Sequence, residues 1–172
     1  MDLKAFTQLV LPTQGRLYRI AKLFLRSREE AEDTLQDVLL KLWSNRQQLD
    51  NYQSVEALAV QMTRNMCLDK LKSKAYQSTE ADTNLPEIST NAKSPYQQAE
   101  LSDSAALMRQ LIEALPEQHK LILHLRDVEE YSFEEIQEIT GMTINNIRVA
   151  LSRARKEVRD GYLKVNNYES RY

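Results

Sequence analysis

The sequence predicts an all-α protein made of two small helical modules joined by a flexible acidic linker. It contains only three glycines and four prolines in 172 residues, too few for the tight turns of a β-sandwich or barrel. Apolar residues recur at helical spacing in both ends of the chain. Between them, residues 75–105 are polar and aperiodic, with five acids against one base. We therefore expect modules over 1–74 and 106–172.

The first module reads as helices separated by short breaks. An apolar stripe at helical spacing runs from Leu17 to Leu25. Ser27 and Glu30 have the spacing of a capping box, which should start the next helix, and that helix should end near Asn45. A further helix is expected from about Ser54 to Lys74. Its buried residues should be Leu58, Met62, Met66 and Leu71.

The second module has the spacing of a helix-turn-helix. Ser132 and Glu135 form a capping box for a short helix that should stop at Gly141, and Thr143 can cap a longer helix. A short helix, a glycine turn and a longer capped helix are typical of DNA-binding proteins. With the apolar stripe inward, six polar or basic residues and one valine face outward near the start of the last helix: Asn145, Asn146, Arg148, Val149, Ser152, Arg153 and Lys156.

These outward side chains suit the reading of a major groove. Asparagine pairs with adenine, arginine pairs with guanine, and further basic residues can meet phosphates. The alternative interpretation is that the basic residues form the solvated face of an ordinary surface helix. Because the short helix, the glycine and the threonine cap occur at the right offsets, the sequence favours a recognition helix.

Charge is sorted along the chain, although the net charge is only −2. Residues 127–138 hold six acids and no base, whereas residues 142–159 hold five bases and one acid. The acidic run could hold a metal or serve acid–base chemistry. No histidine lies in it, and Glu134 and Glu135 lie at a helix start, so capping and solvation are favoured. This edge should face away from DNA or towards protein.

Little else in the sequence points to chemistry. Cys67 is the single cysteine, so an internal disulfide is excluded, and a neutral packed thiol is favoured over a redox sensor. His119 and His124 are five residues apart, which is not the spacing of a metal pair on a helix. No catalytic or cofactor motif occurs. We expect a cytoplasmic protein that is not an enzyme, has no cofactor and has no membrane-spanning segment.

Three stretches carry a resemblance to a known family. They are DTLQDVLLKLW at 33–43, TRNMCLDKLK at 63–72 and LPEQHKLILHLRDVEEYSFEEIQEITGMTINNIRVALSRARKEVR at 115–159. In this order the chain resembles the extracytoplasmic-function group of bacterial RNA polymerase sigma factors. The first two stretches match sigma region 2 and the third matches region 4. The central region of larger sigma factors is missing between them.

The resemblance implies a subunit that binds core RNA polymerase and directs promoter-specific transcription initiation. Region 2 in the family docks on the β′ clamp, and region 4 binds the β flap. Carried over by position, the residues implied for core binding are Asp33, Gln36, Asp37 and Lys41. Those implied for engaging and opening the minus-10 element are Asn51, Tyr52, Arg64, Asn65 and Lys70. The outward residues of the last helix would read the minus-35 element. An anti-sigma factor would be a natural further partner.

Two departures from the family pattern affect these expectations. Many members have an aromatic residue at the position of Leu58, so packing or stacking there must differ. The family often has Lys-Ser-Arg where this chain has Arg148-Val149-Ala150. The minus-35 sequence that this chain reads should therefore differ from the familiar one.

Two other functions remain open from the residues alone. A stand-alone helix-turn-helix regulator would bind an operator without polymerase, but it leaves DTLQDVLLKLW without a role. A helical adaptor that binds only protein would account for the unusual Val149-Ala150. Whether the two modules pack against each other is also left open by a linker of this composition.

Overall fold

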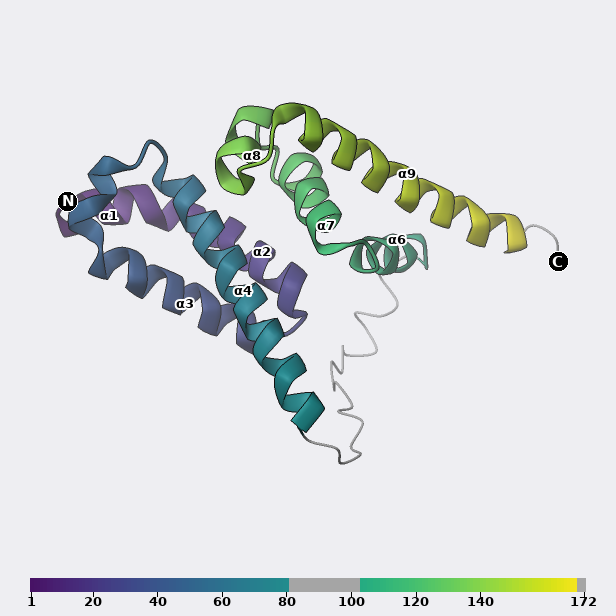
Figure 1. The fold of residues 1–172 in the computed structure, drawn as a ribbon, viewed down its shortest axis with the longest axis horizontal. Coiled ribbons are helices and arrows are strands. Elements are labelled where there is room, and N and C mark those ends of the chain that lie inside the picture. The colour runs from purple at the N-terminus through teal and green to yellow at the C-terminus, as the bar shows by residue number, and fades with distance from the viewer. Residues whose placement is uncertain (81–102, 170–172) are drawn as a thin grey trace.

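The computed structural model describes residues 1–80 and 103–169. All regular secondary structure in these two ranges is helical (Figure 1). The elements are α1 (Leu3–Val10), η1 (Leu11–Thr13), α2 (Gln14–Leu25), α3 (Arg28–Ser44), η2 (Arg46–Asn51), α4 (Val55–Glu80), α6 (Asp103–Glu113), α7 (Glu117–Leu123), η3 (His124–Val128), α8 (Phe133–Thr140) and α9 (Ile144–Glu169). None of the helices in the described ranges combines the length and apolarity needed to cross a membrane.

The first module is a bundle in which α2, α3 and α4 pack against one another. The predicted α2 stripe is confirmed, because Leu17, Ile20, Ala21, Phe24 and Leu25 are all buried. Ser27 caps α3 by accepting a hydrogen bond from the backbone amide of Glu30 at 3.3 Å. The Glu30 carboxylate does not complete the expected capping box; it pairs with Lys74 of α4 instead. This pair ties the start of α3 to α4.

Helix α4 differs from the prediction in its length and its buried face. It runs to Glu80, and α6 begins at Asp103, so the expected linker over 75–105 is helical at both ends. The rest of that linker lies outside the described residues. The four residues predicted to be buried on α4 are only half-buried. Among the α4 residues whose burial the structure describes, the buried ones are Ala57, Ala59, Val60, Thr63 and Cys67. The reason is that α4 packs against α2 and α3 and also against α8, so small side chains line its closest contacts.

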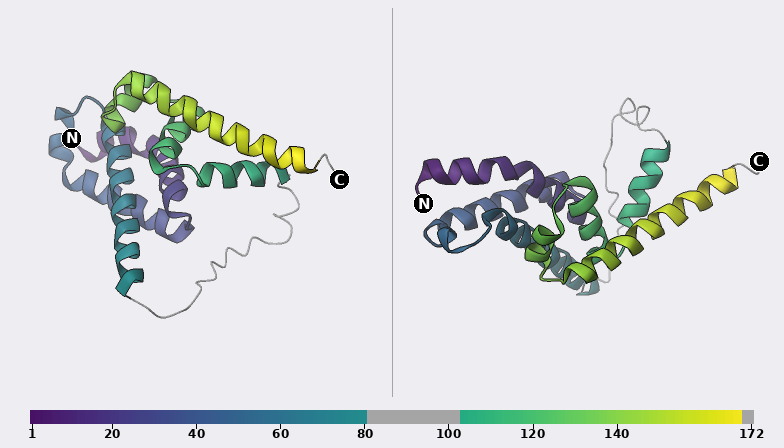
Figure 2. Two further views of the ribbon diagram at one scale, coloured as in Figure 1. Left: turned by 45° about the vertical axis from the view of Figure 1, so that its right-hand side comes forward. Right: turned by 90° about the horizontal axis from the view of Figure 1, so that it is seen from above.

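The second module confirms the predicted helix-turn-helix. Ser132 and Glu135 form a complete capping box at the start of α8. Gly141 ends that helix with φ of 72°, a left-handed conformation that glycine adopts without steric cost. Thr143 then accepts a hydrogen bond from the Asn146 amide at 3.2 Å and caps α9. Figure 2 shows α9 continuing beyond this motif, with α6 beside its distal part.

The two modules contact each other, which settles a point that the sequence leaves open. Helix α8 of the second module packs on α4 of the first (Figure 1). A shallow pocket at this contact is lined by residues of both modules: Ser54, Glu56, Ala57, Tyr131, Glu135 and Ile139. Arg19 of α2 also reaches a carboxylate of the second module, and Arg26 at the C-cap of α2 reaches a backbone carbonyl there. We call this the closed arrangement.

Candidate functional surfaces

The predicted recognition face is exposed on the first turns of α9. All seven residues expected there are exposed, while Ile147, Leu151 and Ala154 between them are buried in the module. Val149 is 40% exposed, which leaves an apolar side chain among polar ones. Such a face offers amide and guanidinium groups for base edges and an aliphatic group for a thymine methyl. The orientation of α9 therefore exposes the side chains that the sequence predicts for contact with DNA bases.

Phe133 and Arg126 also belong to this face, and the sequence reading missed both. The Arg148 guanidinium carbon lies 5.2 Å from the centre of the Phe133 ring, and that of Arg126 lies 4.6 Å from it. Arg126 also donates a hydrogen bond to the Tyr131 carbonyl at 2.8 Å. The ring holds both cations by cation–π attraction. No local pattern signals this group, because its three side chains come from η3, α8 and α9.

The predicted docking face lies on α3. Asp33, Gln36, Asp37 and Lys41 are all exposed along this helix. Leu40 lies among them and is 64% exposed, which is unusual for a large apolar side chain surrounded by charges. The sequence reading did not select it, although its spacing from Gln36 and Asp37 places it on the same side of the helix. An apolar centre with charged neighbours suits a protein-binding surface.

The five residues predicted for the minus-10 element do not form one cluster. Asn51 and Tyr52 are exposed at the end of η2, just before α4, and Tyr52 is 48% exposed. Asn65 is exposed and Arg64 half-buried further along α4. Lys70 lies about 22 Å along the helix from its start. Its ammonium group donates to the Thr34 hydroxyl at 2.8 Å and lies 3.8 Å from the Asp37 carboxylate. Lys70 is therefore directed to α3 and its docking face.

In the acidic run over residues 127–138, Glu129 is buried, which the sequence did not predict. The residues of this run were expected to be capping or solvated, but the Glu129 side chain is only 2% exposed. Arg19 of α2 donates two hydrogen bonds to its carboxylate, at 2.6 and 2.8 Å. Asp127 is also paired, to Arg155. Within the described ranges, no group of three or more potential ligands is arranged to hold a metal ion. Glu129 thus faces the first module, whereas Asp127 is paired within the second.

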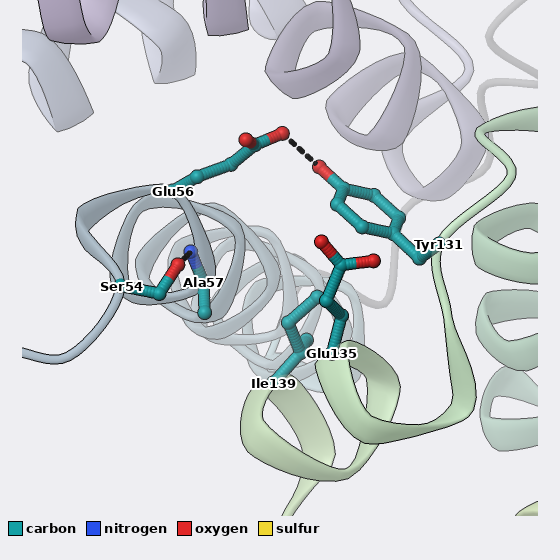
Figure 3. Close-up of a pocket in the computed structure, with 6 residues that line it drawn as sticks. All are labelled: Ser54, Glu56, Ala57, Tyr131, Glu135 and Ile139. Atoms are coloured by element: carbon teal, nitrogen blue, oxygen red, sulfur yellow. Dashed lines mark hydrogen bonds between the residues drawn. The ribbon is translucent and has the colours of Figure 1, made fainter.

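Glu129 is the centre of an ion-pair cluster between the modules. Arg16 Nε lies 3.7 Å from Glu129 Oε2, and Arg16 Nη1 donates to Glu56 at 2.6 Å. The Tyr131 hydroxyl donates to the same Glu56 oxygen at 2.6 Å, as the close-up in Figure 3 shows. His124 Nε2 lies 3.1 Å from Glu129 Oε1. Each of the two arginines of α2 therefore reaches a carboxylate at this contact, and Tyr131 of the second module reaches across to α4.

The cluster shifts the ionisation of its members. Burial alone would raise the pKa of Glu129, but the hydrogen bonds and charge of Arg19 outweigh burial and lower it. The pKa of His124 is lowered by burial, and Glu129 offsets only part of this effect. Burial and the hydrogen bond to Glu56 raise the pKa of the Tyr131 phenol. At neutral pH the carboxylate is thus charged and the imidazole neutral.

We expect the folded protein to lose stability as the pH falls below about 6.5, the ordinary pKa of histidine. A group whose pKa is lowered by folding takes up its proton first in the unfolded chain, so acidification favours unfolding. For one proton the slope is at most about 1.4 kcal/mol per pH unit. Urea unfolding between pH 7 and 5 measures it. The His124→Asn variant should flatten the slope; a slope equal to that of the unmodified protein would contradict the assignment to His124.

Comparison with known proteins matches both modules to one family. The family model for Sigma-70 region 2 matches residues 9–76, and that for Sigma-70, region 4 matches residues 105–158. The chain is 27% identical to the RNA polymerase sigma factor YlaC of Bacillus subtilis over 142 residues, and this aligned stretch covers 82% of each protein. It is 26% identical over 172 residues to the ECF RNA polymerase sigma factor SigE of Mycolicibacterium smegmatis, covering 96% of this chain and 64% of that protein.

The fold of the whole chain is also similar to that of a solved sigma factor. It superposes on the sigma factor RpoE from Bartonella quintana, solved in complex with the anti-sigma factor NepR, with a TM-score of 0.75 and 23% identity. The match covers 95% of this chain and 99% of RpoE. A chain with regions 2 and 4 in this order is a sigma factor of the sigma-70 type. Within that class, this chain belongs to the extracytoplasmic-function group of RNA polymerase sigma factors, which direct transcription initiation.

Proposed function

We propose that this sigma factor binds core RNA polymerase through the α3 face and reads promoters with both modules. Asp33, Gln36, Asp37 and Lys41 contact the β′ clamp, and Leu40 supplies the apolar centre of that contact. The α9 face reads the minus-35 element. Asn51, Tyr52, Arg64 and Asn65 engage the minus-10 element, while Lys70 supports the α3 face. The proposal is supported best by one observation: the α3 and α9 faces are both exposed, in a chain that matches sigma regions 2 and 4.

The same proposal covers location, chemistry and partners. The protein acts in the cytoplasm, where RNA polymerase transcribes, and it contributes binding rather than catalysis. The second module also contacts the β flap. A relative of the same fold was solved with an anti-sigma factor. We infer that an anti-sigma factor controls this chain too.

Promoter binding requires the closed arrangement to open. The minus-10 and minus-35 elements are about 25 base pairs apart, or about 85 Å along a duplex at 3.4 Å per base pair. A compact chain of 172 residues has a radius of gyration of only about 16 Å. The closed molecule therefore cannot place one face on each element, and the ion pairs around Glu129 must break when the polymerase-bound protein engages a promoter.

Gel filtration with purified bacterial core RNA polymerase at moderate salt tests the proposed function. We expect the chain to co-elute with core enzyme, and the complex to initiate transcription on fragments that core enzyme alone ignores. Duplex binding of equal selectivity with and without polymerase would instead identify a stand-alone regulator. Failure of folded protein to co-elute or to bind duplex would favour an adaptor that binds only protein.

A further inference from the structure

The contact between the modules pairs basic residues of α2 with acidic and carbonyl groups. Arg16 and Arg19 lie one turn apart on this helix, and both reach Glu129 of the second module. Arg26 follows at the C-cap of α2 and donates to the Glu113 carbonyl at 2.9 Å. Residues 1–74 carry 12 basic and nine acidic residues, so the module that these arginines belong to is net positive. Separation of the modules would leave Arg19 without its only carboxylate partner among the described residues.

Glu129 is bound as a phosphate would be. Two nitrogens of Arg19 donate to its two oxygens, at 2.6 and 2.8 Å, and a second guanidinium lies 3.7 Å away. This two-pronged geometry is the one by which arginine binds both carboxylate and phosphate. The arginine side chains are 41% and 50% exposed, so they lie at the rim of the contact, within reach of a large ligand. The carboxylate is the buried partner.

We propose that Arg16 and Arg19 form a phosphate-binding face for the DNA backbone, and that Glu129 occupies it in the closed arrangement. The inference rests on the opening of the modules described under the proposed function. When they separate, a backbone phosphate replaces the carboxylate, so the arginines exchange one anion for another. DNA thereby favours the open form. In the free protein, Glu129 suppresses non-specific binding to DNA by neutralising the charge of these arginines.

The test uses the full chain and a 30-base-pair duplex of arbitrary sequence, because a phosphate contact is independent of sequence. Binding is measured between 50 and 200 mM KCl. Glu129→Gln keeps the side-chain shape but removes the charge. Arg19 loses its carboxylate partner on opening, whereas Arg16 keeps Glu56 of its own module. One additional phosphate contact should steepen the slope of log K against log salt by about 0.9, and the variant should therefore bind more tightly than the unmodified chain at 50 mM and lose about 3.5-fold more affinity by 200 mM.

Matched variants separate this effect from a change in net charge. Glu130→Gln makes the same charge change at the exposed neighbouring position and should leave the slope unchanged. Adding Arg16→Gln and Arg19→Gln to Glu129→Gln should restore the original slope. Small-angle scattering reports opening independently through a larger radius of gyration. If Glu129→Gln stays closed, Glu129→Lys, compared with Glu130→Lys, forces separation by placing a cation against two arginines.

Three results would overturn the inference. One is an open variant whose salt slope equals that of its Glu130 control. Another is a steeper slope that survives removal of both arginines. The third is gained binding to poly-glutamate without gained binding to duplex, which would assign the face to an acidic protein. None of these affects co-elution with core polymerase, so failure here is distinguishable from failure of the proposed function.

Discussion

Asp37→Arg is expected to weaken binding to core RNA polymerase at least tenfold, which corresponds to about 1.4 kcal/mol. The Asp37 side chain is 57% exposed and lies on the α3 face beside the exposed Leu40. Interfaces place complementary charges opposite each other, and a like-charge juxtaposition costs several kcal/mol. Gel filtration or a fluorescence titration with labelled chain measures the change. Binding to duplex DNA should remain as in the unmodified protein.

The fold should survive this substitution, since the contact that it removes is weak. The Asp37 carboxylate lies 3.8 Å from Lys70, and such exposed ion pairs contribute about 0–1 kcal/mol. Asp50→Arg is the matched control, because it makes the same charge change at a 67% exposed position of the first module that lies on η2 rather than on α3. Equal loss of core binding in the two variants would argue against a specific α3 face.

Arg148→Ala is expected to lower selectivity for the minus-35 element by about tenfold to a hundredfold while sparing core binding. A paired contact from arginine to guanine contributes about 1–3 kcal/mol of discrimination against the wrong base. The Phe133 ring holds the Arg148 guanidinium in place on the exposed side of α9. The measurement is transcription by the reconstituted holoenzyme from promoters randomised over their upstream half. The variant should accept several bases at one position where the unmodified protein selects one.

Arg109→Ala provides the control for Arg148→Ala. It removes the same charge from an exposed position on α6, outside the helix-turn-helix. Selectivity should be unchanged in this control. Loss of core binding by Arg148→Ala, or an equal drop on every promoter sequence, would mean that Arg148 contacts phosphate or supports the fold rather than reading a base.

Local signals predicted most of the fold correctly. The capping box at Ser132, the left-handed Gly141 and the Thr143 cap each depend on residues within a few positions, so the helix-turn-helix was predictable. The buried face of α4 was not, because it depends on which helices pack against it. Residues such as Ala57 and Cys67 lie closest to neighbouring helices, while the larger Leu58 and Met62 lie at the edges.

The site residues likewise fall into those that local sequence predicts and those that depend on packing between distant segments. Periodicity identified the exposed positions of α9, which depend only on the stripe facing inward, and the family resemblance supplied those of α3. The ion-pair cluster was missed because Arg19 and Glu129 are 110 positions apart in the chain. In sequence, a buried acid in an acidic run is indistinguishable from its solvated neighbours. Lys70 shows the same limit, since its contact with Thr34 of α3 depends on how two helices pack.

The burial of Cys67 makes the protein suitable for distance measurements. This thiol is 0% exposed and, mainly through burial, its pKa is raised to about 12. The thiolate is the nucleophile that attacks maleimides and thiol-reactive spin labels, so the native cysteine should stay unlabelled near neutral pH. One introduced cysteine on each module could then carry a dye or spin label without prior removal of Cys67. Opening of the two modules on polymerase could be followed in a chain that is otherwise native.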